Sequence, residues 1–174
     1  MASGVELRSD IVDVYLFRRS RSGAEFLQML RSEEPMKGTW HPIMGHMHEG
    51  EDAVSTALRE LKEETGLGSR VGVNADGVSA CGMSLGMWAL EQVHPFFIAR
   101  LNCIVFSPRF VVEVGPGWEP VLNEEHEAAR WVLVDGVSGA GSEAFVWPGQ
   151  RASVREVMEH IVRGGSQMEG LARV

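Results

Sequence analysis

The chain has 174 residues, 44% hydrophobic and 23% charged, a size and composition that suit one ordinary globular domain over residues 1–174. Its 16 basic and 24 acidic residues give a formal net charge of −8, which argues against binding to duplex nucleic acid. The apolar runs are far shorter than the roughly 20 residues that cross a bilayer, and the first residues lack the apolar stretch of a secretory signal. We therefore expect a cytoplasmic protein with no membrane partner.

Extended segments open the chain. Residues 11–17 and 25–30 are rich in β-branched and aromatic side chains and flank a turn-like stretch, so they predict a β-hairpin. Residues 39–44 form a short extended piece that Pro42 interrupts, as at the end of a strand. Residues 45–50 are predicted to form a loop.

The clearest helix covers residues 51–65, where apolar side chains recur at helical spacing and Gly66 stands where a helix would stop. Residues 68–88 give no clear pattern. The remaining elements expected are strands at 96–106, 110–114 and 129–134, a loop at 135–143, and a second helix at 150–163. Several strands with one central and one terminal helix predict a mixed α/β (α+β) fold in which a sheet lies between helices.

Acidic residues are concentrated around the first predicted helix. Residues 45–67 contain six acidic and two basic side chains. Glu63 and Glu64 lie three and four residues after Glu60, so the three carboxylates lie on one side of the helix. Such like charges repel, whereas a divalent cation with oxygen ligands, such as Mg²⁺, would stabilise them. The spacing alone also fits an ordinary solvated helix face, so both interpretations stay open at this point.

The wider pattern of residues 45–67 resembles the signature of the Nudix hydrolases. It begins at Gly45 and reads G-x5-E-x7-R-E-U-x-E-E-x-G-U, where U is an aliphatic residue, and it agrees at every defined position. The resemblance implies an α/β/α sandwich with a mixed central β-sheet between helices. It also implies an enzyme, a Nudix pyrophosphohydrolase that acts on acid anhydrides in phosphorus-containing compounds.

The resemblance assigns roles to particular residues. In the box, Glu60, Glu63 and Glu64 would be metal ligands together with the carbonyl of Gly45. Farther along, Glu125 is the best positional match to a carboxylate that joins the metal site or acts as the base, with its neighbours Glu124 and Glu127 as alternatives. The cofactor implied is Mg²⁺, with Mn²⁺ as a substitute. The candidate catalytic residues are therefore Glu51 and Arg59, as an orienting ion pair, with Glu60, Glu63, Glu64 and Glu125.

Segments outside the box resemble one branch of the family, the bacterial dATP and dihydroneopterin-triphosphate pyrophosphohydrolases; they are residues 38–40, 125–131 and 147–151. Planar heterocycles stack on aromatic rings, and the aromatic candidates for a base or pterin site are Trp40, Phe96, Phe97 and Trp147, each of which also suits a core position. Arg31 could bind a phosphate through its planar guanidinium. His46 and His48 are expected to contact phosphate or solvent, with a zinc site as the alternative.

The expected reaction is Mg²⁺-dependent hydrolysis of a dATP-like nucleoside triphosphate, giving a nucleoside monophosphate and pyrophosphate. One alternative is an ADP-ribose or dinucleoside polyphosphate pyrophosphatase. Another is a Nudix domain that senses nucleotides without hydrolysing them, and a third is a metal-dependent isomerase. The expected partner is a small-molecule nucleotide, and the sequence leaves a homodimer open.

Overall fold

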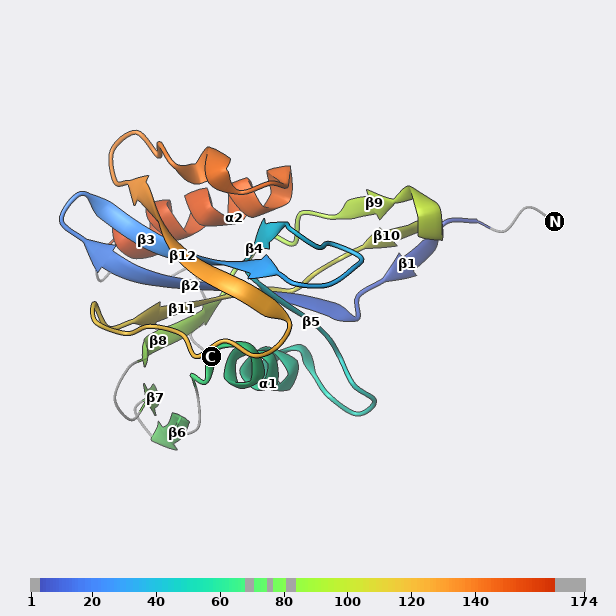
Figure 1. The fold of residues 1–174 in the computed structure, drawn as a ribbon, viewed down its shortest axis with the longest axis horizontal. Helices are drawn as coiled ribbons and strands as arrows, with labels where there is room; N and C mark the ends of the chain where they lie inside the picture. Colours follow the sequence, from blue (N-terminus) through green and yellow to red (C-terminus); the bar gives the residue numbers. More distant parts are fainter. Residues whose placement is uncertain (1–3, 68–70, 75–76, 81–83, 165–174) are drawn as a thin grey trace.

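The computed structural model describes residues 4–67, 71–74, 77–80 and 84–164 (Figure 1). The strands of its main sheet are β2 (Ile11–Ser20), β3 (Gly23–Arg31), β4 (Trp40–His41), β5 (Ile43–His46), β8 (Ser84–Ala89), β11 (Arg109–Val114) and β12 (His126–Asp135). They are arranged in the order β12-β3-β2-β11-β8, with β4 paired to β3 and β5 paired to β2. Because β2 and β11 are parallel while β2 and β3 are antiparallel, the sheet is mixed.

Two helices cover opposite faces of this sheet (Figure 1). They are α1 (Ala53–Thr65) and α2 (Pro148–Val157), the second continuing as a short π-helix at Met158–Val162. Side chains of β2 alternate between the two faces, as the period of a strand requires. Val14 is buried in one core cluster with Leu61 of α1, and Tyr15 is buried in another with Val154 of α2. The predicted α/β/α sandwich with a mixed central sheet is confirmed.

A smaller sheet extends from one end of the main sheet (Figure 1). It consists of β1 (Glu6–Arg8), β9 (Phe96–Ile98) and β10 (Cys103–Val105), with β10 in the middle. A separate hairpin joins β6 (Val71–Asn74) to β7 (Gly77–Ala80). None of the described helices is both long and apolar enough to span a membrane.

The prediction of one strand over residues 96–106 is wrong. A 3₁₀ turn at Ala99–Leu101 interrupts the segment, and Asn102 follows with a left-handed backbone (φ 49°). Asn tolerates this conformation better than most residues, so the chain reverses here and β9 pairs antiparallel with β10. The predicted hairpin of residues 11–17 and 25–30 is present as β2 and β3.

Some boundaries differ for identifiable reasons. The first helix begins at Ala53 because Asp52 is its N-cap, with a carboxylate that accepts a hydrogen bond from the Ser55 amide at 2.7 Å. Strand β5 extends into the predicted loop, since His46 and Gly45 pair with the start of β2. The second helix begins at Pro148, where proline suits the first helical position. Within the predicted loop of residues 135–143, a 3₁₀ turn begins at Ser142.

Candidate active site

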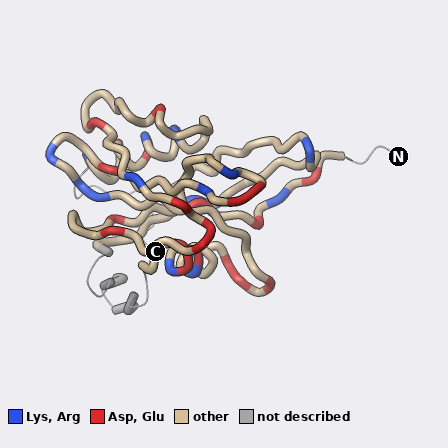
Figure 2. Tube along the Cα trace, viewed as in Figure 1, with Lys and Arg blue, Asp and Glu red and all other residues tan. Residues whose placement is uncertain are grey.

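The three carboxylates of α1 occupy different environments. Glu63 is exposed, Glu60 is partly buried, and only 2% of Glu64 is accessible to solvent. Figure 2 shows further acidic residues along the loop before α1 and on the segment that leads into β12. Negative charge therefore gathers at one end of the sheet, from segments far apart in the sequence.

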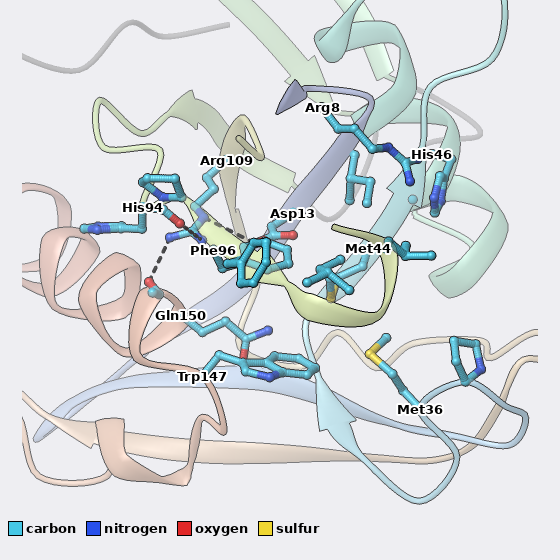
Figure 3. A pocket seen from close by; sticks show the side chains of 18 of the residues that line it. Arg8, Asp13, Met36, Met44, His46, His94, Phe96, Arg109, Trp147 and Gln150 are labelled. Carbon is cyan, nitrogen blue, oxygen red and sulfur yellow. Dashed lines mark hydrogen bonds and ion pairs between the residues drawn. The ribbon is translucent and has the colours of Figure 1, made fainter. Parts of the chain in front are cut away.

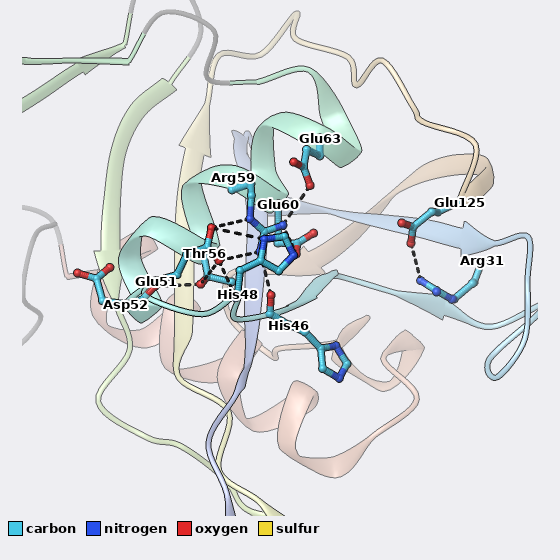
Figure 4. A network of polar contacts seen from close by, with 10 residues as sticks. All are labelled: Arg31, His46, His48, Glu51, Asp52, Thr56, Arg59, Glu60, Glu63 and Glu125. Carbon is cyan, nitrogen blue, oxygen red and sulfur yellow. Dashed lines mark hydrogen bonds and ion pairs between the residues drawn. The ribbon is translucent and has the colours of Figure 1, made fainter.

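Arg59 connects this acidic face to the preceding loop (Figure 4). Its guanidinium donates two hydrogen bonds to Glu51, at 2.8 and 2.9 Å, and one each to Glu60 at 2.7 Å and Glu63 at 3.1 Å. It also donates to the carbonyl of His46 at 2.8 Å. The hydrogen bonds from Arg59, together with one from the backbone amide of His48, lower the pKa of the Glu51 carboxyl to about 2. A planar five-donor group can satisfy several carboxylates at once, which an ammonium group cannot do in this geometry.

Gly45 lies where β5 approaches α1 most closely. A Cβ atom at this position would be 2.0 Å from Cδ of Glu60 and 2.2 Å from its Cγ. The space beside the backbone of Gly45 is thus filled by the Glu60 side chain. Only glycine permits this approach, which brings the strand backbone and the helix carboxylate together.

Glu64 faces a buried histidine pair. Its Oε2 atom lies 3.6 Å from Nε2 of His126, whose ring centroid is 5.4 Å from that of His41. Burial, reinforced by repulsion from Glu60 and Glu125, raises the pKa of Glu64 to about 9. Burial also lowers the pKa of His126 to about 4. Near neutral pH the carboxyl therefore holds its proton unless positive charge is placed beside it.

The donor set fits a hard divalent cation. The candidate ligands are carboxylate oxygens and one backbone carbonyl, which is the ligand type of Mg²⁺. Oε2 of Glu64 is buried without a hydrogen-bond partner among the described residues, and a cation would satisfy it. Within the same described ranges, no three His, Cys, Asp or Glu side chains are grouped closely enough to hold an ion as they stand. Coordination would therefore require Glu60 and Glu63 to turn away from Arg59.

Glu125 lies near this face although it belongs to the turn just before β12. It pairs with Arg31, at the end of β3, over 3.0 Å, and about half of its side chain is exposed (Figure 4). Its charge contributes to raising the pKa of Glu60 and of Glu64, so it is close enough to act on both.

A cavity of about 1470 Å³ runs from this acidic face to an aromatic end (Figure 3). Of the predicted site residues, Gly45, His46, Glu60, Arg31, Glu125, Phe96, Phe97 and Trp147 line it. Trp40 does not line it; its ring lies under the guanidinium of Arg130, whose central carbon is 4.1 Å from the ring centroid. Phe97 is more than half exposed, whereas Phe96 is partly buried. His48 lines the cavity as well, and its backbone amide donates to Glu51.

Sequence reasoning missed a buried polar group at the aromatic end. Arg109 pairs with Asp13 over 3.2 Å, with both side chains almost fully buried. Burial raises the pKa of Asp13 to about 6, against the opposing effects of Arg109 and Ser107. Gln150, also buried, lines the same cavity. A sequence signal for Gln150 was available, because this polar residue lies one helical turn before Val154, in line with the apolar stripe of the helix.

Comparison with known proteins places this geometry in a family. Residues 7–157 match the profile of the NUDIX domain, and no curated protein matches the chain in sequence. The fold is similar to that of the E. coli dihydroneopterin triphosphate pyrophosphohydrolase, at 18% identity, with 87% of this chain and 98% of that one covered and a TM-score of 0.63. It is also similar to a C. elegans Ap4A hydrolase, at 17% identity, 86% and 94% coverage and a TM-score of 0.61.

A Nudix hydrolase from M. smegmatis is a third structure of this kind, at 19% identity, 88% and 85% coverage and a TM-score of 0.56. At these identities the structures establish a common fold. The family match spans most of the chain and supports the predicted enzyme class, a pyrophosphohydrolase. The chain belongs to the NUDIX domain family.

Proposed function

We propose that the protein is a divalent-metal-dependent hydrolase of a nucleoside triphosphate, releasing a nucleoside monophosphate and pyrophosphate. The observation that carries the proposal is the cavity, which joins Glu60 of α1, Gly45 and Glu125 to an aromatic end; Glu63 and Glu64 lie beside Glu60 on α1 but do not line it. A triphosphate needs a cation-binding region for its phosphates and an apolar region for its base. Both regions line this one cavity.

Each end of the cavity has a defined task in this proposal. Glu60, Glu63, Glu64 and Glu125 would hold the cation with the carbonyl of Gly45. When bound, the cation supplies positive charge to the phosphate oxygens and lowers the pKa of a nearby water molecule. The metal proposed is Mg²⁺, with Mn²⁺ as a substitute.

The remaining residues bind, orient or transfer a proton. Glu125, half exposed at the cavity wall, accepts the proton of the attacking water where it does not itself hold the cation, and the box glutamates are the alternative bases. Arg31 binds a phosphate oxygen once Glu125 no longer occupies its guanidinium. Arg59 and Glu51 keep the acidic face in register with the loop. Phe96 and Trp147 form apolar walls for the base, and Phe97 and His46 contact the substrate at the rim, whereas Trp40 lies outside the cavity.

The test is release of pyrophosphate and phosphate from dNTPs, NTPs, ADP-ribose and diadenosine polyphosphates. Each substrate is assayed with Mg²⁺, with EDTA, and with the variant Glu64→Gln. Glu49→Gln is the matched control, because Glu49 is an exposed loop carboxylate whose side chain forms no hydrogen bond or ion pair with the described residues. Pyrophosphate that requires the metal and falls by orders of magnitude only in Glu64→Gln supports the proposal. If neither the wild type nor either variant releases pyrophosphate or phosphate from any of these compounds, the proposal is rejected.

The size of the cavity favours a second candidate, a dinucleoside polyphosphate. Its volume of about 1470 Å³ exceeds the roughly 300–1,000 Å³ of ordinary small-molecule pockets. The C. elegans relative is named as an Ap4A hydrolase. In the same assay, release of a mononucleotide from diadenosine polyphosphates, with dNTPs inert, would select this candidate.

The other parts of the proposal concern the whole protein. We assign residues 1–174 to a single Nudix domain and the protein to the dATP and dihydroneopterin-triphosphate branch. A cytoplasmic location stays a prediction, and the homodimer stays open. The alternative function is a domain that senses nucleotides without hydrolysing them. It would be supported if the protein is inactive in every assay while a nucleotide raises its melting temperature.

A further inference from the structure

Gln150 is a buried amide without an internal partner. It is the third residue of α2, and 2% of its surface is exposed. Neither its Oε1 nor its Nε2 atom forms a hydrogen bond with any residue in the described ranges. Buried polar groups in native proteins are nearly always paired, and leaving both ends of an amide unpaired destabilises the fold.

A second buried glutamine of this chain shows the ordinary arrangement. Gln28, fully buried in β3, donates to the carbonyl of Ala144 at 3.3 Å. Its Oε1 accepts two hydrogen bonds from Arg130, at 3.0 and 2.8 Å. The fold thus satisfies a buried amide that serves only structure, and Gln150 differs in this respect.

The amide of Gln150 is directed at the substrate cavity. In Figure 3 its side chain reaches into the space between Phe96 and Trp147, and all three residues line the cavity. Both aromatic residues are only partly buried, so their rings leave room for a planar ligand. Stacking faces with an amide between them match the needs of a heterocycle, whose faces are apolar and whose edge is polar.

The position of Gln150 is fixed by the contacts of its helix. Arg109 donates to the carbonyl of Gly149 at 2.8 Å and to Oγ of Ser153 at 2.8 Å. Its other side pairs with Asp13 of β2. A Cβ at Gly149 would lie 2.9 Å from Nη2 of Arg109, so the first turn of α2 packs directly on this guanidinium. The backbone that carries Gln150 is therefore held in place before any ligand binds, which reduces the entropy lost on binding.

We propose that Gln150 reads the edge of the substrate's heterocycle, accepting one hydrogen bond through Oε1 and donating one through Nε2. This inference rests on the proposed function for the identity of the substrate as a nucleotide. An edge with a donor next to an acceptor satisfies both ends of the amide, and the 6-amino group beside a ring nitrogen of adenine is such an edge. An edge with two acceptors leaves Oε1 unpaired.

The experiment compares two ligands that differ in one group. One is the α,β-methylene form of dATP, and the other is the same compound with hydrogen in place of the 6-amino group. Their dissociation constants are measured with Mg²⁺ by calorimetry for the wild type, Gln150→Met and Gln150→Glu. The controls are Gln28→Met, a buried glutamine away from the cavity, and Arg155→Met, an exposed residue of the same helix.

The wild type should prefer the amino compound by about tenfold or more, since removing one partner leaves a buried group unpaired. The preference should disappear in Gln150→Met, decrease in Gln150→Glu, and persist in both controls. Stability gives an independent readout: Gln150→Met should keep or raise the melting temperature, whereas Gln28→Met should lower it. No preference in the wild type, or an unchanged preference in Gln150→Met, overturns the inference.

The outcome also separates this inference from the proposed function. If the preference depends on Gln150 while no natural triphosphate or dinucleotide is cleaved, the hydrolase proposal fails and the reading of the base stands. If metal-dependent cleavage occurs but Gln150→Met retains the full preference, the hydrolase stands and the inference about Gln150 fails.

Discussion

Replacing Gly45 by alanine tests whether the close approach of β5 to α1 positions Glu60. The substitution keeps the backbone carbonyl but adds a Cβ 2.0 Å from Cδ of Glu60, where ordinary contact begins at 3.4 Å. The difference, 3.4 minus 2.0, requires a movement of about 1.4 Å. The whole side chain must move, because Cγ is also too close, at 2.2 Å, and because Arg59 holds the carboxylate at 2.7 Å.

A displacement of this size should affect turnover more than folding. Misplacing a reacting group by about 1 Å can cost about a hundredfold in rate, so we expect kcat to fall by about that factor. Overpacking should cost about 1–3 kcal/mol of unfolding free energy. The assays are steady-state pyrophosphate release from the best substrate and denaturant unfolding.

Gly117→Ala is the control for Gly45→Ala. Gly117 is exposed, and a Cβ there would meet no atom within 4 Å. The control should match the wild type in both assays. Wild-type kcat in Gly45→Ala, in protein that is fully folded, would refute the argument that this strand positions Glu60.

Three other predictions concern charged groups. Arg59→Lys should lower kcat/KM at least about tenfold and change the melting temperature little. The reason is that lysine cannot bind Glu51 through two nitrogens and still reach Glu60. A kcat/KM equal to that of the wild type would contradict this role. Glu51→Gln should destabilise the protein at pH 6, but less and less as the pH falls from about 4.5 toward 2. The sign follows from the depressed pKa of about 2, since a carboxylate favoured by folding stabilises above its unfolded pKa and stops doing so as it is protonated. Denaturant titrations of both proteins at pH 6 and pH 3.5 measure this, and a difference independent of pH would count against it. Arg109→Met should cost about 3–5 kcal/mol of unfolding free energy by leaving Asp13 buried without its partner. Adding Asp13→Asn should restore part of that loss, and a purely additive double variant would show that the pair is not coupled.

The acidic face of α1 was predictable because it is a local property. Residues three and four apart on a helix share a side, so Glu60, Glu63 and Glu64 could be placed together from their spacing. The alternating faces of β2 follow from an equally local period. The hairpin of β2 and β3 and the helix–sheet–helix arrangement could be inferred in the same way.

The aromatic end of the cavity depends on how strands distant in the sequence pair with one another, so it was less predictable than the acidic face. Arg109 pairs with Asp13 because β11 lies beside β2 with these two residues opposite each other. Trp40 is the opposite example, a residue that was predicted for the site but lies outside it. The pairing of β12 with β3 places Arg130 over the Trp40 ring. No periodicity within either segment contains this information.

The guanidinium of Arg59 gives the acidic face an internal counterion. Carboxylates from the loop and from two turns of α1 share this one positive group before any metal arrives. Small metal-dependent domains such as zinc fingers unfold when their ion is removed, because the ion alone holds their ligands together. Here Arg59 already neutralises Glu51 and two of the proposed ligands, Glu60 and Glu63, so folding and metal loading are separate events. A chelator should silence the enzyme and leave its fold intact, and the metal can then be exchanged freely on a folded protein.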